Sequence, residues 1–93
     1  MRYRHNDILY KNLADAYYSI GILEKAIYNY EHAIIENSSN TEAHYNLAVC
    51  HYQQENYYNA SIYIDKALKH NPNNEVYKEM KKYNDEKILS NAI

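Results

Sequence analysis

The chain carries five successive stretches in which apolar and aromatic residues recur three or four positions apart. That spacing places them on one face of an α-helix, while the polar residues between them face outward. Short segments containing Asn, Ser, Gly or Pro separate the stretches. We therefore predict five helices, at residues 7–20, 23–36, 41–54, 57–70 and 75 to about 90.

Several polar side chains beside these segments have the character of helix caps. Ser39 and Glu42 have the spacing of a capping box, in which a serine begins the helix and an acid reaches back to its backbone. Residues 71–74, Asn-Pro-Asn-Asn, are predicted to end the fourth helix and cap the fifth. Asn6 or Asp7 can cap the first helix.

Two parts of the chain repeat each other with a period of 34 residues. When residues 7–40 are aligned with residues 41–74, eight of 34 positions are identical. The identical pairs are Asn12/Asn46, Leu13/Leu47, Ala14/Ala48, Tyr18/Tyr52, Ala26/Ala60, Ala33/Ala67, Asn37/Asn71 and Asn40/Asn74. Each unit is a pair of predicted helices, and Gly21 in the first unit suits the left-handed turn that ends a helix.

The two units also share a pattern of residue size. Their first helices present a large residue, Leu, a small residue and another large residue: Tyr10, Leu13, Ala14 and Tyr17, then His44, Leu47, Ala48 and His51. Their second helices present a small, a large and a small residue: Ala26, Tyr30 and Ala33, then Ala60, Ile64 and Ala67. Together with the 34-residue period and Pro72 near the end of the second unit, this pattern resembles the tetratricopeptide repeat family.

The resemblance implies an all-α fold, a right-handed superhelix of antiparallel helix pairs with about five helices. It divides one domain into an N-terminal extension (1–6), a first unit (7–40), a second unit (41–74), and a capping helix with its tail (75–93). The shared alanines would lie where paired helices approach closely.

The second unit departs from the family pattern in two ways. His44 and His51 replace the usual aromatic residues, so we expect a more polar core there. Glu55 replaces the turn glycine, so we expect a less favourable turn.

The resemblance also implies a function. In this family the first helix of each pair lines a concave groove that binds a peptide or a helix of a partner protein. By position, the partner-binding residues are Lys11, Asn12, Asp15, Tyr18, Tyr45, Asn46, Val49, Tyr52 and Gln53, flanked by Ile8, Ser19 and Glu42. We expect Tyr18 and Tyr52 to form one ladder along the groove, and Asn12 and Asn46 another. Both tyrosines equally fit a second interpretation, in which they pack between adjacent helices.

Co-chaperone-like members of the family hold the acidic C-terminal tails of chaperones in a carboxylate clamp. Here Lys11 and Asn46 match two of its positions. Asp15 stands where the clamp needs an Asn, and Val76 and Met80 stand where it needs a basic pair. Because Asp15 would repel a carboxylate, we expect the clamp to be incomplete and Lys11 to pair with Asp15 one helical turn away.

Composition narrows the function classes further. The chain has 93 residues, 24% of them charged, and a net charge of −2. With this balance of charge, it lacks the basic surface of a nucleic-acid-binding protein. With 13 Tyr and no Phe or Trp, the core should be semi-polar. No apolar run approaches the ~20 residues of a membrane span, and the single Cys50 excludes an internal disulfide. We therefore expect a cytoplasmic protein that binds neither nucleic acid nor membrane.

The sequence supports no catalytic residue, metal site or cofactor. His44 and His51 lie seven residues apart on one helix, about 10 Å, which is too far to share an ion. Cys50 and His51 are adjacent and therefore point in directions about 100° apart, so they do not form a thiol–imidazole pair. No serine has the glycines of a nucleophile elbow around it.

We therefore expect a protein-interaction scaffold that binds through its concave face, and not an enzyme. The alternative is self-association into a homo-oligomer, because two repeats are fewer than the roughly three that a stable array needs. The predicted ends carry apolar residues that copies could share: Ile8, Leu9, Ile88, Leu89 and Ile93. The small repeat number also favours a segment of a longer protein.

Overall fold

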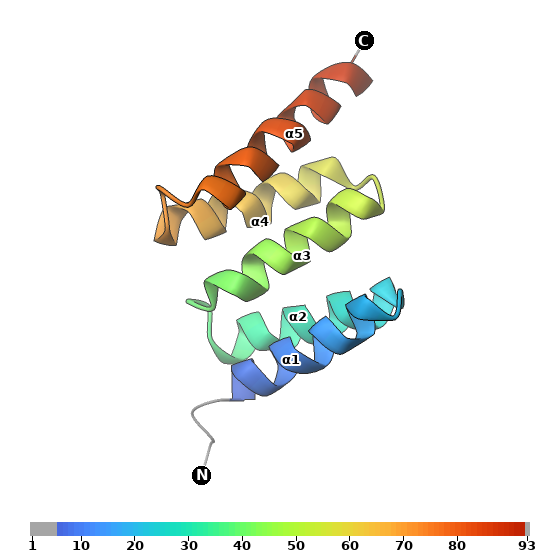
Figure 1. Cartoon of the computed structure of the whole chain (residues 1–93), viewed down its shortest axis with the longest axis vertical. Helices are drawn as coiled ribbons and strands as arrows, with labels where there is room; N and C mark the ends of the chain where they lie inside the picture. The colour runs from blue at the N-terminus through green and yellow to red at the C-terminus, as the bar shows by residue number, and fades with distance from the viewer. Residues whose placement is uncertain (1–5, 93) are drawn as a thin grey trace.

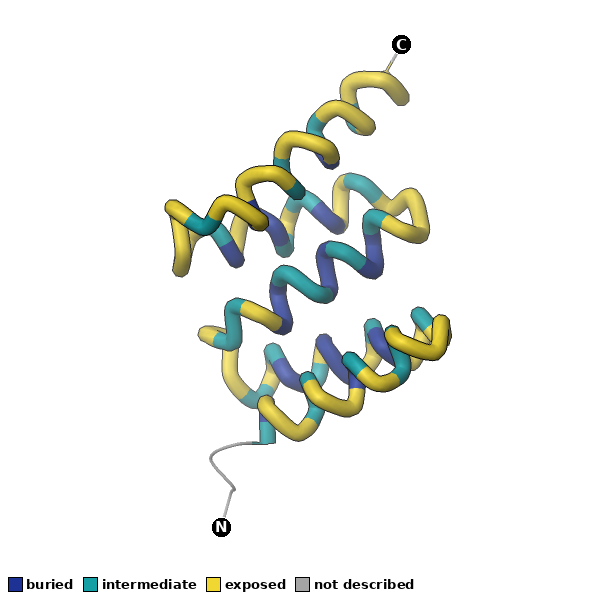
Figure 2. Tube along the Cα trace, in the orientation of Figure 1, coloured by how far each residue is buried: buried dark blue, intermediate teal, exposed yellow. Residues whose placement is uncertain are grey.

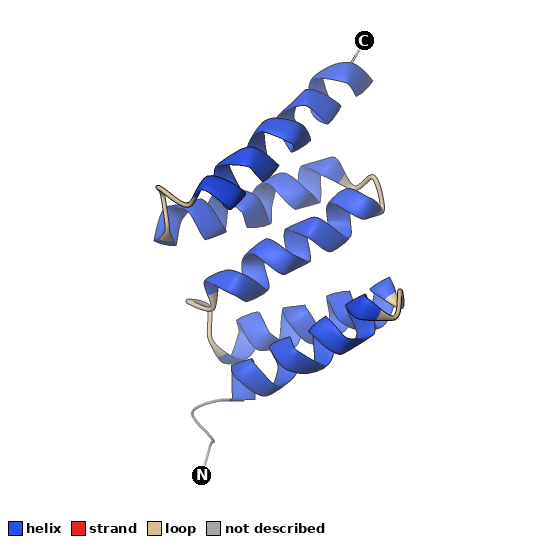
Figure 3. Cartoon of the chain, viewed as in Figure 1, coloured by secondary structure: helices blue, strands red, loops and turns tan. Residues whose placement is uncertain are grey.

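The computed structural model describes residues 6–92. They form five helices: α1 (Asn6–Ser19), α2 (Leu23–Glu36), α3 (Thr41–Gln53), α4 (Tyr57–His70) and α5 (Glu75–Asn91). Short loops join the helices, and the described residues contain no strand (Figure 3). The predicted all-α class and the five helices are confirmed, with every helix end within one residue of its predicted position. The expectations for residues 1–5 and for Ile93 fall outside the described residues.

The helices stack in the order of the chain. Each packs on the next, from α1 on α2 to α4 on α5, which gives a body of 51 × 29 × 18 Å. In Figure 1, α1, α3 and α5 form a layer towards the viewer, with α2 and α4 behind them. Each repeat therefore contributes its first helix to one face, and α5 covers the far side of α4 as a capping helix does.

The core depends on small side chains where helices meet. Its fully buried alanines include the ones that the two units share: Ala14, Ala26, Ala33, Ala48, Ala60 and Ala67. Tyr30, Leu47 and Ile64 are the largest apolar side chains buried among them. Figure 2 shows that α3, which lies between α2 and α4, carries buried residues along its whole length. The helices thus approach closely at the alanines, and a few large residues fill the remaining space between them.

The polar core expected in the second unit is present. His44 and His51 are buried in α3, and both rings stack on Tyr63 of α4, with centroid distances of 6.1 and 5.7 Å. Nε2 of His44 donates a hydrogen bond to the carbonyl oxygen of Ser38 at 2.9 Å. The Nδ1 atoms of both histidines are buried without a hydrogen-bond partner in the described residues. These histidines therefore act as packing residues that fill the aromatic positions of the repeat.

The turns inside the two repeats have the same backbone geometry. Gly21 has a φ of 84°, the left-handed conformation predicted for it. Glu55, at the matching position, has a φ of 61°. A side chain is disfavoured in this conformation, so the less favourable turn expected in the second repeat is confirmed.

The capping box predicted at Ser39 and Glu42 is wrong. The cap of α3 is Asn40, whose side-chain oxygen accepts a hydrogen bond from the backbone N–H of Ala43 at 3.0 Å. The helix begins one residue later than the box requires, so Ser39 lies in the preceding turn and Glu42 pairs with Lys11 instead. Asn74 caps α5 as predicted, by the same contact to Tyr77.

Asn6 and Asp7 both lie inside the first turn of α1, so neither caps it in the predicted way. The carboxylate of Asp7 instead accepts hydrogen bonds from the side chains of Asn37 and Asn40, at 3.2 and 2.8 Å. The start of α1 is thereby attached to the loop that joins the two repeats.

At the other end, Asn84 attaches α5 to the body. Its side chain is fully buried and donates to the backbone carbonyl of Tyr57 at 2.9 Å.

None of the five helices has the combination of length and apolar character that crossing a membrane requires.

Candidate functional site

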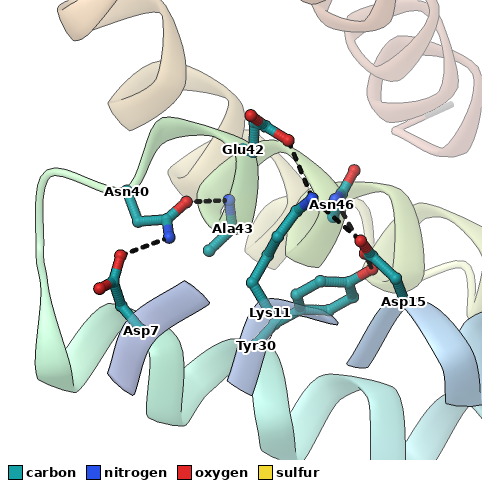
Figure 4. A network of polar contacts seen from close by, with 8 residues as sticks. All are labelled: Asp7, Lys11, Asp15, Tyr30, Asn40, Glu42, Ala43 and Asn46. Carbon is teal, nitrogen blue, oxygen red and sulfur yellow. Dashed lines mark hydrogen bonds and ion pairs between the residues drawn. The ribbon is translucent and has the colours of Figure 1, made fainter. Parts of the chain in front are cut away.

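A line of polar contacts joins α1 to the start and body of α3. The pairs are Asp7 with Asn40, Lys11 with Glu42, Asp15 with Asn46, and Tyr18 with Gln53, at 2.8, 3.0, 3.3 and 2.5 Å. On α1 these residues are spaced by three or four positions, so they follow one face of the helix. Figure 4 shows the first three pairs bridging the two helices. We call these eight residues the polar seam.

Asp15 receives three donors and is the centre of this seam. One carboxylate oxygen accepts from the hydroxyl of Tyr30 and from the side chain of Asn46. The other lies 3.0 Å from Nζ of Lys11, the ion pair expected from their spacing. Burial and the neighbouring carboxylate raise the pKa of Tyr30 far above its ordinary value, so the phenol keeps the proton that it donates. Figure 4 shows Tyr30 reaching from α2 to this carboxylate.

The seam engages five of the nine residues expected to bind a partner: Lys11, Asp15, Tyr18, Asn46 and Gln53. Lys11 is only 19% exposed and lies between the carboxylates of Asp15 and Glu42. Of the two residues expected to form the asparagine ladder, Asn46 donates its side-chain amide to Asp15 at 3.3 Å. The polar groups of these residues hold the first repeat against the second.

The two tyrosines of the expected ladder are half-buried. The ring of Tyr18 packs against the core cluster that α1 and α2 share with α3, and that of Tyr52 packs against the core of the second repeat. Tyr52 also meets Tyr57 edge to face, with ring centroids 5.4 Å apart. The interpretation of packing between helices therefore describes these rings, although part of each remains exposed on the face.

The other four expected residues are open on the same face or border its exposed part: Asn12, Tyr45, Val49 and Tyr52. Asn12 is exposed, and its side chain makes no hydrogen bond to residues 6–92. Tyr45 stacks on Tyr77 of α5, with ring centroids 4.8 Å apart and planes 27° apart. Three of these four residues lie on α3, and Asn12 adds an exposed position on α1.

A pocket of about 210 Å³ lies between α3 and α5. Its lining residues are Tyr45, Val76, Glu79, Met80 and Tyr83. Glu79 accepts a hydrogen bond from the hydroxyl of Tyr83 at 3.1 Å. Val76 and Met80, which stand at the basic positions of the carboxylate clamp, are wall residues of this pocket.

Sequence reasoning passed over Glu79 and Tyr83 as site residues, although a signal was available. Adding the 34-residue period to the groove positions 42, 45, 46 and 49 gives 76, 79, 80 and 83, which are the four α5 residues of the pocket. The comparison with the carboxylate clamp carried the register only to Val76 and Met80, and the other two positions were not considered.

The charged residue that lines the pocket is acidic, Glu79. Burial, with the charge of Glu79 adding to it, raises the pKa of Tyr45. Burial and the charge of Glu42 likewise raise the pKa of Tyr77. The charges of Glu79 and Glu42 therefore act on the stacked tyrosine pair, and Glu42 is itself paired with Lys11, which it shares with Asp15.

Within the described part of the chain, Cys50 and the histidines show neither a reactive thiol nor a metal-binding group. Cys50 is fully buried, and burial with the charge of Asp15 raises the pKa of its thiol to about 11. Such a thiol is protonated and inert at neutral pH. Within residues 6–92, no group of three or more His, Cys, Asp or Glu is arranged to hold a metal ion.

Comparison with known protein families gives two matches. The family model described as "Tetratricopeptide repeat" matches residues 41–74. The family model described as "TPR repeat" matches residues 8–55, which is more than half of the chain. A search of curated proteins returned no match. The first matched range coincides with the second unit found by self-alignment.

Proposed function

The chain belongs to the tetratricopeptide repeat family, whose repeats are non-catalytic modules of protein–protein interaction, and we propose that it binds a peptide segment of a partner protein on the face formed by α1, α3 and α5. The observation that carries this proposal is the pocket between α3 and α5, with its aromatic and apolar lining. Interface anchors bind in pockets of this kind, because aromatic walls give large contact areas at little cost in side-chain entropy.

The polar seam supports the same proposal indirectly. It fixes α1 against α3 through four cross-helix contacts, so the face is held in one shape before a ligand arrives. A preformed surface loses less conformational freedom on binding and therefore gives tighter binding for the same contacts. The seam residues are thus assigned to shaping the face, and Asn12 together with the residues towards α5 to contacting the ligand.

The test begins with peptides selected from a random displayed library on the folded chain. Their affinity is then compared between the wild type and two variants of the face, Asn12→Ala and Val49→Ala. We expect each variant to weaken binding about fivefold or more, with the denaturation midpoint unchanged for Asn12→Ala. Asn59→Ala makes the same change on the exposed surface of α4 and should leave the affinity unaltered.

These variants avoid a complication of the more obvious choices. Tyr18→Ala would remove a ring that packs on the core, and Asn46→Ala would remove a partner of Asp15. A loss of binding in either could come from a distorted repeat. The proposal fails if selected peptides lose as much affinity with Asn59→Ala as with the two variants of the face.

Self-association is a second candidate, and it rests on the outer surface of α1. Leu9 and Leu13 are 65% and 47% exposed, whereas their counterparts one repeat later, Ala43 and Leu47, are fully buried against α2. They line a pocket of about 280 Å³ together with Asn6 and Tyr10. This surface is therefore one that the repeat architecture normally covers with another helix.

Light scattering over a range of concentrations tests the second candidate. We expect the apparent mass to rise with concentration, and the substitution of Lys for both Leu9 and Leu13 to abolish the rise. Ile35→Lys, on the exposed side of α2, should leave it in place. A mass that stays at one chain throughout the range would exclude self-association through α1.

A further inference from the structure

We infer that the pocket between α3 and α5 accepts a cationic side chain, lysine or arginine, of the bound peptide. This inference rests on the proposed function, because it assumes that a peptide lies on this face. It concerns the five lining residues, which combine two tyrosine rings, a thioether, one aliphatic side chain and one carboxylate.

The lining matches the two parts of a long cationic side chain. The rings of Tyr45 and Tyr83 and the thioether of Met80 provide an apolar wall along which an alkyl stem can lie. Tyrosine faces attract cations through their negative π-surface. Glu79 provides the opposite charge, and its carboxylate is oriented by the hydroxyl of Tyr83 at 3.1 Å.

The surrounding charges point the same way. The charges of Glu79 on α5 and Glu42 on α3 act on the stacked Tyr45 and Tyr77, and Glu42 is also paired with Lys11 at 3.0 Å. Of the lysines of α5, Lys78 pairs with Glu75, and Lys81 pairs with Asp65 and Asp85, whereas Lys82 and Lys87 make no ion pair within residues 6–92. A cation in the pocket would therefore meet carboxylates, while an acidic side chain would meet like charge.

The size of the pocket also limits its occupant. Sites that bury a drug-sized ligand have volumes of about 300–1,000 Å³, and the pocket is smaller, at about 210 Å³. It therefore suits one side chain rather than a folded element. A purely apolar side chain of the same length would contact the apolar wall but would leave the carboxylate of Glu79 without a cationic partner.

The experiment uses short synthetic peptides, acetylated and amidated at their ends, that are identical except at one central position. That position is lysine, arginine, norleucine or glutamate; norleucine keeps the alkyl stem of lysine and removes the charge. Binding is followed by the shifts of the backbone amide signals of α3 and α5 in a nuclear magnetic resonance titration. We expect the lysine and arginine peptides to bind about five- to tenfold more tightly than the norleucine peptide, and the glutamate peptide more weakly than norleucine.

The variant Glu79→Gln should remove the advantage of lysine over norleucine. Glu24→Gln, which makes the same charge change on the exposed surface of α2, should preserve it. Raised salt should reduce the advantage, because exposed charge pairs are screened.

The outcomes separate this inference from the proposed function. If lysine and norleucine peptides bind equally, or if Glu79→Gln leaves the preference for lysine intact, the inference is wrong while the peptide-binding face stands. If neither these peptides nor the library-selected ones shift the amide signals of α3 and α5, the inference and the proposed function are both overturned.

Discussion

Glu55 holds in the second repeat the position that Gly21 holds in the first, and its backbone is in the same left-handed region, at a φ of 61° against 84°. Glycine reaches this region without steric cost, whereas a residue with a Cβ atom is disfavoured there by roughly 1–2 kcal/mol. The second repeat thus keeps the turn geometry of the first while carrying a residue that opposes it.

Replacing this residue should stabilise the protein. We expect Glu55→Gly to raise the free energy of unfolding by about 0.5–1 kcal/mol, because relief of the strained backbone exceeds the extra freedom that glycine gives to the unfolded chain. Urea denaturation measures the difference. Gln54→Gly is the matched control, because Gln54 is the adjacent residue and has an ordinary φ of −87°. This substitution should lower the free energy of unfolding. Destabilisation by Glu55→Gly would show that the side chain has a role that outweighs its strain.

The two helix caps one repeat apart should differ in strength. Asn40 and Asn74 both accept a hydrogen bond from the third backbone N–H of their helix, at 3.0 Å. Asn40 also donates to the buried carboxylate of Asp7 at 2.8 Å. We expect Asn74→Ala to cost about 1 kcal/mol and Asn40→Ala about 2 kcal/mol or more. Equal losses in urea denaturation would mean that the bond to Asp7 contributes nothing net.

Asp15, the centre of the polar seam, and Tyr30 should be energetically coupled. Removing the carboxylate by Asp15→Ala leaves the hydroxyl of Tyr30, a residue only 2% exposed, without its acceptor. We expect a loss of about 2–3 kcal/mol, most of it from that unpaired buried group. Adding Tyr30→Phe removes the orphaned hydroxyl, so the double variant should be no less stable than Asp15→Ala alone. A double-mutant cycle in which the two losses simply add would contradict this coupling.

Acid should destabilise the fold through the buried histidines. Burial lowers the pKa of His44 and of His51 below the ordinary value of 6.5. As the pH falls through 6.5, the unfolded chain binds protons that the folded state resists. The contribution of the two neutral histidines to the free energy of unfolding is therefore complete above pH 6.5. It declines as the pH falls below 6.5, until the folded-state pKa values are reached. The decline is at most about 1.4 kcal/mol per pH unit for each histidine.

Comparing urea denaturation at about pH 7.5 and about pH 5.5 measures this decline. His51→Phe retains a ring against Tyr63 and removes one titrating group, so it should make the stability less dependent on pH. Neighbouring charges also shift the pKa values of these histidines. Those of Lys66 and His70 lower the pKa of His44, and that of Glu31 raises the pKa of His51. An unchanged pH dependence in His51→Phe would exclude this histidine as a source.

The helices and the repeat were predictable because their signals are local. Hydrophobic spacing and the identity of pairs such as Ala26 and Ala60 depend only on positions within one unit or one period. The cap of α3 was misplaced by one residue, because Ser39 and Glu42 match the motif but the helix begins at Thr41. Motif spacing cannot determine which of two adjacent polar residues takes the extended backbone of a cap.

The candidate site was harder to predict, because it depends on how one repeat lies against the next. Tyr18 and Gln53 are 35 residues apart, and nothing in their neighbourhoods indicates that they meet. Only Lys11 and Asp15, four residues apart on one helix, gave a contact that sequence spacing could predict. The residues of the face could be recognised from their register in the repeat. Which of them hold the repeats together and which are open to a ligand could be seen only from the three-dimensional arrangement.

The order in which the helices stack has a consequence for local opening of the chain. α3 lies between two neighbours and buries six residues, whereas α1 and α5 bury two each. Backbone amides in α3 should therefore exchange their hydrogens only when most of the molecule opens, and those in α5 much sooner. A ligand held between α3 and α5 would join the best-protected helix to one of the least protected. Its arrival should be detected first as slower amide exchange in α5.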